Sequence, residues 1–168
     1  LGVSGAILLG LPNPAFSDID LRVYGADHAR RLRAVLDRLE RDGLTPLPPD
    51  RRARWRAETA PRFGLEAETI ADLEARRWHY RLFRGRYVSL HPTRADGEIQ
   101  ERYGERRYTP LGPAVVEARV TDASEAMFLP AVYRVADVRW REGGPGPLDE
   151  IVSFEGLYCN AAEVGERV

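Results

Sequence analysis

Two aspartates, Asp18 and Asp20, stand two residues apart directly after Ser17. Residues 19–24 alternate apolar and polar side chains, which predicts a strand with one buried face. Side chains two residues apart on a strand share a face, so the two carboxylates should converge. Converging carboxylates repel each other unless a cation lies between them, and Mg²⁺ or Mn²⁺ prefers such oxygen ligands. We therefore expect Asp18 and Asp20 to bind a divalent metal that leaves positions open for phosphate oxygens, as two-metal phosphoryl or nucleotidyl transfer requires.

A glycine turn ahead of the aspartates supports this interpretation, because an Asp-x-Asp pair alone is more often solvated surface. Residues 1–10 are apolar with three glycines, and we expect a buried turn that leads into a helix. A glycine turn at a helix N-terminus offers backbone N–H groups to phosphates. Gly5, Ala6, Gly10 and Ser17 are therefore the predicted nucleotide-binding residues.

The spacing of the glycine turn and the aspartates resembles the DNA polymerase beta-type nucleotidyltransferase superfamily, whose motif is Gly-Ser at a helix start followed by Asp-x-Asp on the next strand. A group of archaeal predicted nucleotidyltransferases is more similar still. The matching segments are Asn13 to Leu21, Ser89 to Pro92, Arg102 to Gly104, Phe128 to Ala131 and Glu155 to Tyr158. The resemblance covers most of the chain and implies a nucleotidyltransferase-like fold that binds a nucleoside triphosphate with Mg²⁺ or Mn²⁺.

Three positions depart from the superfamily pattern. Ala6 stands where the triphosphate-binding Ser is usual, and Leu9 stands where a basic residue is usual. The third carboxylate of the superfamily has no clear match, since the strand expected over residues 87–91 presents Ser89 and His91. A neutral His91 could act as a general base or a third metal ligand. The alternative is a histidine that packs at the strand end and caps a loop.

The remaining patterns predict an α/β (α+β) fold, a mixed sheet with helices followed by a small β domain. Asp27 is a predicted N-cap of a helix that closes at Gly43. Further helices are expected over residues 50–60, 66–79 and 96–103, and a hairpin over 80–91 that turns at 84–85. Strands near 116–120, 132–138 and 151–158 surround a loop at 143–147. We place the domain boundary near residue 110, giving domains 1–109 and 110–168. The second domain resembles an incomplete oligonucleotide-binding-type barrel.

Charge and composition narrow the classes of partner. The 168 residues carry a net charge of −1, so no global attraction to nucleic acid or membrane is expected. Every one of the 25 basic residues is Arg, and residues 50–86 hold ten Arg against six acids. Interleaved Arg and aromatic residues suit RNA, although solvated Arg around buried Trp explains the same pattern. No apolar run spans a membrane and no leader is recognised, so a cytoplasmic protein is expected. Scarce thermolabile residues fit a thermophile, and a GC-rich genome explains the Arg usage equally well.

These patterns leave three hypotheses for function. The first is a metal-dependent nucleotidyltransferase that moves a nucleoside monophosphate from a nucleoside triphosphate to a hydroxyl on an RNA, a protein or a small molecule. Its catalytic residues would be Asp18, Asp20 and His91. The second is a catalytically weak module of the same fold that binds nucleotide or RNA, which the missing Ser and third acid favour. The third is a structural domain whose aspartates are surface residues.

Overall fold

A computed structural model describes residues 1–144 and 146–168 of the chain. The fold is of the α+β class and divides into two compact units, Leu1–Ala95 and Asp96–Val168. Residues 99–114 hold neither helix nor strand, and the boundary predicted near residue 110 lies within them. No helix among the described residues is long and apolar enough to cross a lipid bilayer.

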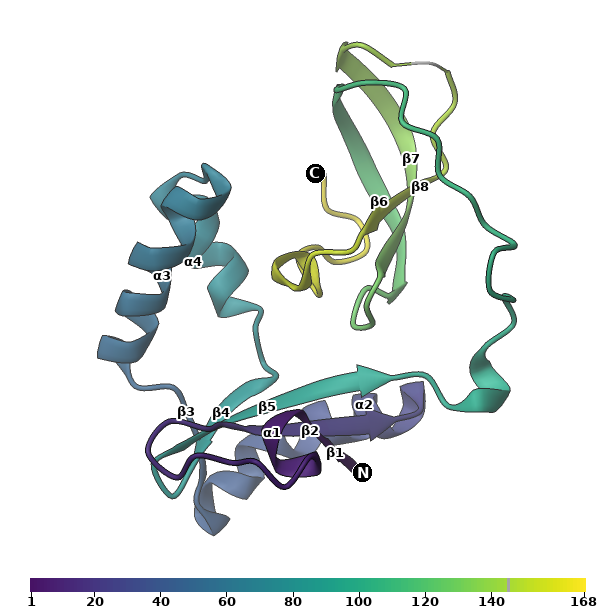
Figure 1. Ribbon diagram of the computed structural model, residues 1–168. Helices are drawn as coiled ribbons and strands as arrows, with labels where there is room; N and C mark the ends of the chain where they lie inside the picture. The colour runs from purple at the N-terminus through teal and green to yellow at the C-terminus, as the bar shows by residue number, and fades with distance from the viewer. Residues whose placement is uncertain (145) are drawn as a thin grey trace. The chain divides into compact units, whose positions relative to one another are not determined.

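The first unit is built on a five-stranded mixed sheet in the order β1-β2-β5-β4-β3 (Figure 1). The strands are β1 (Gly2–Ser4), β2 (Ile19–Tyr24), β3 (Leu44–Pro46), β4 (Tyr80–Phe83) and β5 (Arg86–Thr93). Only the central pair, β2 and β5, runs parallel, and the other three pairs are antiparallel. The strand at 19–24 and the hairpin at 80–91 were both predicted correctly, because each shows alternation or a Gly turn.

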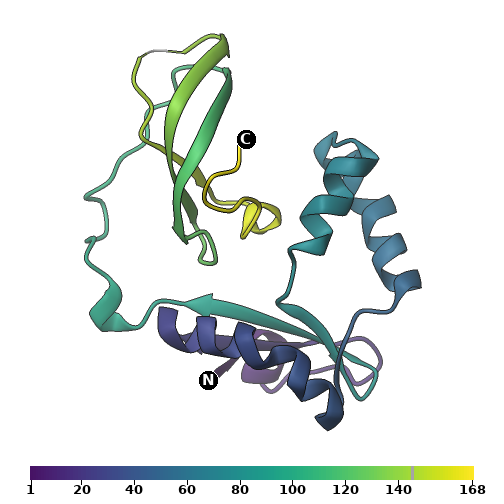
Figure 2. The ribbon, with the colours of Figure 1, turned by 180° about the vertical axis from the view of Figure 1, so that it is seen from behind.

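Helix α2 (Ala26–Val35), with the 3₁₀ helix η1 (Leu36–Asp42) after it, lies along one face of this sheet (Figure 2). Ala29 and Leu36 are buried there against apolar side chains of β2 and β5. Gly43 closes the element as predicted, with a φ of 91° that favours glycine. The predicted N-cap is wrong by two residues: Gly25 caps the helix, and Asp27 lies in its first turn, paired with Arg30.

Between β3 and β4 the chain forms a helical hairpin of α3 (Pro49–Phe63) and α4 (Ala67–Ala75). The break predicted between the two helices is at Gly64, which has a φ of 63°, whereas Pro61 lies inside α3. Ile70 and Leu73 of α4 are buried. A carboxylate on α4, Glu74, binds Arg52 and Arg56 of α3 and so ties the two helices together.

Two predictions about local structure are wrong. The apolar N-terminal residues are not core: Leu1, Leu8, Leu9 and Leu11 are all exposed. The helix there, α1 (Gly5–Leu8), has a single turn and presents too little surface to bury its neighbours. The helix expected over 96–103 is only the 3₁₀ turn η2 (Asp96–Glu98), because Gly97 interrupts it and no apolar stripe follows.

The second unit is a three-stranded antiparallel sheet, β6-β7-β8, formed by β6 (Val115–Glu125), β7 (Ala131–Glu142) and β8 (Glu150–Ser153). C-terminal residues bond to the free edge of β6, with Ala118 and Val168 exchanging two backbone hydrogen bonds of 2.9 Å. An oligonucleotide-binding barrel has five strands, whereas the described residues of the second unit form three. The predicted resemblance to such a barrel therefore extends only to a small β unit. Residues 156–158, predicted as strand, form the 3₁₀ turn η3 (Gly156–Tyr158), and Pro145 of the predicted 143–147 loop lies outside the described residues.

His79, just before β4, links the stability of the first unit to pH. Burial lowers its pKa from 6.5 to about 3, and the nearby charge of Arg77 adds to the effect. As the pH falls, His79 therefore binds a proton in the unfolded chain at a higher pH than it does in the folded chain. The stability that depends on neutral His79 is complete above pH 6.5 and is lost as the pH falls toward 3.

We predict that replacing the ionisable ring removes this pH dependence. Between pH 6 and 4, the free energy of unfolding should fall less steeply in His79→Phe than in the native chain. The difference between the two slopes should approach about 1.4 kcal/mol per pH unit. Urea titrations at a series of pH values measure the slope. His28→Phe, at an exposed histidine, is the control and should follow the native profile. Parallel profiles for His79→Phe and the native chain would contradict the prediction.

Candidate functional site

Asp20 lies in a row of aligned residues across the face of the sheet opposite α2. Strand register pairs Asp20 with Ser4 of β1 on one side and with Ser89 of β5 on the other, and Ser89 in turn pairs with Tyr80 of β4. Side chains paired in this way point to the same face of a sheet. The parallel pairing of β2 with β5 therefore brings together side chains 69 residues apart.

A chain of hydrogen bonds fixes the Asp20 carboxylate. The Ser89 hydroxyl donates to Oδ1 of Asp20, and Nε2 of His91 lies 2.8 Å from the Ser89 oxygen. Since the Ser89 proton is directed to the carboxylate, its oxygen accepts, so His91 donates through Nε2. Ser89 is buried at 2% exposure, which makes it a positioning residue and not an accessible nucleophile.

His91 is consequently held with Nδ1 as the ring nitrogen left to accept a proton. Burial lowers its pKa below the ordinary value, and the charge of Arg22 on β2 lowers it further, while Asp20 and Asp18 oppose the shift. The imidazole is therefore neutral at pH 7, the form that a general base or a metal ligand requires. Nε2 of His91 also lies 3.7 Å from Oδ1 of Asp20, so the histidine predicted from sequence is beside the predicted carboxylate.

Asp18 is exposed and lies immediately before β2. Its negative charge acts on both His91 and Tyr87. Because side chains alternate along a strand, continuation of β2 by one residue would direct its carboxylate to the same face as Asp20. Across residues 1–144 and 146–168, no group of three or more His, Cys, Asp or Glu side chains is close enough to hold a metal ion. Mg²⁺ is commonly held by one or two carboxylates together with substrate phosphates, so the Asp18–Asp20 pair fits a metal that arrives with its nucleotide.

Gly5 approaches the free oxygen of Asp20. Its φ is 68°, and a Cβ atom added there would collide with Oδ2 of Asp20. The absent side chain therefore lets the carboxylate oxygen that Ser89 does not bind lie against the backbone of Gly5. This contact gives a local reason for glycine at position 5. From the sequence alone, we predicted that Gly5 serves phosphate binding.

The other predicted nucleotide-binding residues lie around the same turn. Ala6 is in α1, and Gly10 follows it with a φ of 69° and no neighbour within 4 Å of an added Cβ. Ser17 accepts a hydrogen bond of 2.8 Å from the Asn13 backbone N–H, so its oxygen helps to close the loop that carries Asp18. Because α1 is one turn long, the carboxylates and not a helix N-terminus are the strongest feature of the site.

Sequence reasoning missed two features. It treated Ser89 as the place of an absent acid, whereas Ser89 binds and positions Asp20; its position opposite Asp20 could be found only from the strand pairing. It also interpreted the Arg residues of 51–86 as either an RNA-binding face or solvated side chains around buried Trp. Several of them are engaged internally: Arg52 and Arg56 with Glu74, and Arg81 with Asp37.

We predict that the contact between Gly5 and Asp20 has a measurable energy. Gly10→Ala should cost about 1 kcal/mol, because a residue with a side chain is strained at positive φ. Gly5→Ala has the same backbone strain and also displaces the bound Asp20 carboxylate, so it should lose about 1 kcal/mol more. Urea unfolding of both variants measures the difference. Equal losses would show that Gly5 is required for its backbone alone.

Comparison with known proteins adds one relative. No family model matches the chain, and no solved structure matches it. The chain is 33% identical over 172 aligned residues to the uncharacterized protein MJ1086 of Methanocaldococcus jannaschii. The alignment covers all of this chain and 48% of that protein, so the chain spans about half the length of this curated relative.

Proposed function

We propose that the first unit carries a nucleotidyltransferase-type site, in which Asp18 and Asp20 hold Mg²⁺ or Mn²⁺ together with the phosphates of a nucleoside triphosphate. One observation carries the proposal. Asp20 is fixed by Ser89 through one oxygen, while its other oxygen faces Gly5, where no side chain intrudes. A fixed carboxylate whose second oxygen makes no hydrogen bond to the described residues, two residues along the chain from another carboxylate, suits a metal–phosphate group.

The residues on this face suit the transfer of a nucleoside monophosphate. The bound cation would supply charge neutralisation for the phosphate oxygens. Neutral His91 would accept the proton of the attacking hydroxyl at Nδ1. The hydroxyl oxygen then bonds to the α-phosphorus, and the bond from that phosphorus to the bridging oxygen breaks. Pyrophosphate leaves with the electron pair, and Ser89 keeps Asp20 in place throughout.

A second candidate function is a catalytically weak module that binds a nucleotide or RNA. Its support is the neutral Ser89 on the strand where a third acid is expected, together with Ala6 and Leu9 at the turn. In this alternative the Asp18–Asp20 pair binds metal and nucleotide without turnover. In the first proposal the acceptor is a hydroxyl, for which RNA bound by the segment 51–86 is one candidate. For the whole protein we further propose a cytoplasmic location and a thermophilic archaeal source.

We predict that each aspartate is needed for pyrophosphate release. The full chain is incubated with Mg²⁺ or Mn²⁺ and each labelled triphosphate, with and without total RNA. Asp18→Asn and Asp20→Asn should each lower release by about 100-fold or more, the scale expected when charge stabilisation of a transition state is lost. Asp42→Asn removes an exposed carboxylate at the end of η1 and should leave the rate unchanged.

Other outcomes separate the candidates. Calorimetric binding of nucleotide with metal, without pyrophosphate release, would favour the binding module. Absence of both metal and nucleotide binding would contradict both proposals. His91→Gln should lower kcat with little change in KM if Nδ1 takes the proton, since the substituted residue keeps a donor for Ser89 but loses the base.

A further inference from the structure

A pocket of about 180 Å³ lies between the α3–α4 hairpin and the sheet of the first unit. The side chains that matter for its chemistry are two arginines and four aromatic residues: Arg52, Arg77, Trp55, Trp78, Tyr80 and Tyr87. We call it the arginine–aromatic pocket. Pockets for drug-sized ligands measure about 300–1,000 Å³, so this one has room for one flat ring system and not for a whole nucleoside triphosphate.

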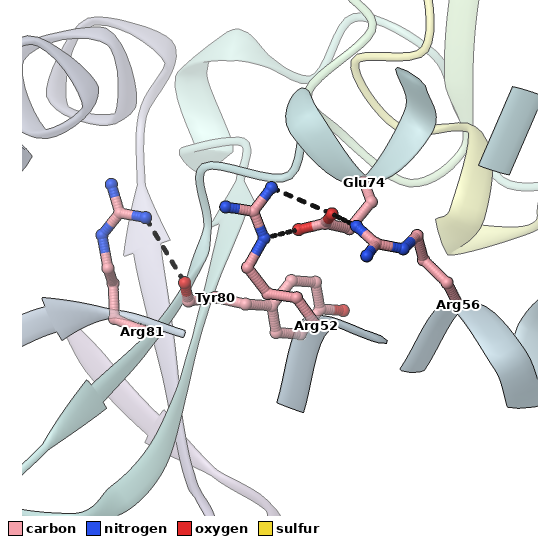
Figure 3. A network of polar contacts seen from close by, with 5 residues as sticks. All are labelled: Arg52, Arg56, Glu74, Tyr80 and Arg81. Carbon is pink, nitrogen blue, oxygen red and sulfur yellow. Dashed lines mark hydrogen bonds and ion pairs between the residues drawn. The ribbon is translucent and has the colours of Figure 1, made fainter. Parts of the chain in front are cut away.

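The acidic side chain of this pocket is already neutralised. Glu74 is only 10% exposed and binds Arg52 through both carboxylate oxygens and Arg56 through one of them, at 2.8 Å (Figure 3). Two guanidinium groups thus share one carboxylate, which leaves a net positive charge around it. Glu74 therefore has little capacity left to accept hydrogen bonds from a ligand.

Arg77 is held by aromatic rings instead of by a carboxylate. Its guanidinium carbon lies 4.2 Å from the centre of the Trp55 ring and 4.1 Å from the centre of the Tyr80 ring. No carboxylate of the described residues pairs with Arg77. Since both contacts are cation–π contacts and no carboxylate is paired with it, the N–H groups of Arg77 can bind a ligand with acceptor atoms.

Two other side chains of the pocket carry hydrogen-bond donors. The indole N–H of Trp78 is buried and has no hydrogen-bond partner. Burial raises the pKa of Tyr87 to about 12, so its phenol stays protonated at neutral pH. An unpaired buried donor is costly, and a ligand that brings acceptors would relieve that cost. The pocket therefore favours a flat group whose edge carries acceptor atoms.

The arginine–aromatic pocket shares its wall with the carboxylate site. Tyr80 is the cross-strand neighbour of Ser89, and Ser89 is the neighbour of Asp20. Tyr87 precedes Ser89 by two residues on β5, so it points to the same face. Two strand spacings separate Asp20 from Tyr80, on the order of 10 Å, which is the scale of one nucleotide.

We propose that the arginine–aromatic pocket binds the base of a nucleotide whose phosphates lie at Asp18 and Asp20, and that it selects keto bases. Guanine presents O6 and N7 as acceptors, which a guanidinium edge binds in a bidentate manner, and uracil presents carbonyl oxygens. Adenine and cytosine present an amino donor at the corresponding edge, which meets the donors of Arg77 and Trp78. The placement of the phosphates rests on the proposed function, whereas the selection of the base rests on the pocket alone.

Calorimetry on the full chain in EDTA tests the pocket without the metal site. GMP and UMP should bind about tenfold more tightly than AMP and CMP, as one good bidentate contact implies. Arg77→Gln should weaken GMP binding about tenfold and remove the preference. Arg77→Lys keeps the charge but loses the planar edge, so it should also lose the preference. Trp78→Phe keeps a ring, removes the N–H and should reduce the preference in part.

Arg62→Gln is the matched control, because Arg62 lies over Phe63 at 5.2 Å on the exposed end of α3, outside the pocket. It should bind GMP as the native chain does. Thermal unfolding monitored by circular dichroism confirms that each variant is folded. Hexamers of uridylate and adenylate form a second arm: preference for the uridylate hexamer over UMP would assign the base to an RNA end, and equal affinity would assign it to a free nucleotide.

The outcomes separate this inference from the proposed function. Keto-base binding that Arg77→Gln weakens and Asp20→Asn leaves intact supports the pocket even if no pyrophosphate is released. Pyrophosphate release that needs Asp20 but has the same KM and base preference in Arg77→Gln would overturn the pocket and leave the proposed function standing. Absence of mononucleotide binding, or equal binding of all four bases, would also overturn it.

Discussion

The parallel pairing of β2 with β5 is the constraint on which the rest of the first unit depends. It is the only parallel pair of the five-stranded sheet, and it connects segments separated by two helices, a helical hairpin and two strands. On one face this pairing buries Val23, Val88 and Leu90 next to α2. On the other it aligns Asp20 with Ser89. A shift of one residue in the register would turn every one of these side chains to the wrong face.

The electrostatics of the site follow from the residue at position 89. A carboxylate there would lie beside Asp20 and add a third negative charge, which a metal would have to balance. A serine supplies a proton to the Asp20 carboxylate instead and stabilises it without a metal. The same hydroxyl orients His91 so that its free nitrogen is Nδ1. The Asp20 carboxylate is therefore held in place by neutral partners.

The use of arginine as the sole basic residue shapes the region around α3 and α4. A guanidinium can form a bidentate ion pair with a carboxylate and can also stack on aromatic rings. An ammonium group is less suited to either interaction. Arg52 uses the first property to bind Glu74, and Arg77 uses the second in its contacts with the rings of Trp55 and Tyr80. The basic segment of the sequence is thus partly an internal framework. Three of its arginines line one pocket, and five others are exposed outside it: Arg51, Arg54, Arg62, Arg84 and Arg86.

The sequence by itself determined the local elements, because their causes are local: alternation for β2, the Gly85 turn for the β4–β5 hairpin, Gly43 and Gly64 for helix ends. It also identified Asp18, Asp20, Gly5 and His91 as one candidate site from spacing and resemblance. It was wrong where a short segment had nothing to pack against, as at residues 1–11 and 96–103. Only the tertiary structure decided that Ser89 binds Asp20 and that Arg77 contacts the rings of Trp55 and Tyr80. Those contacts join segments far apart in the chain, and hydrophobic periodicity carries no information about which strands become neighbours.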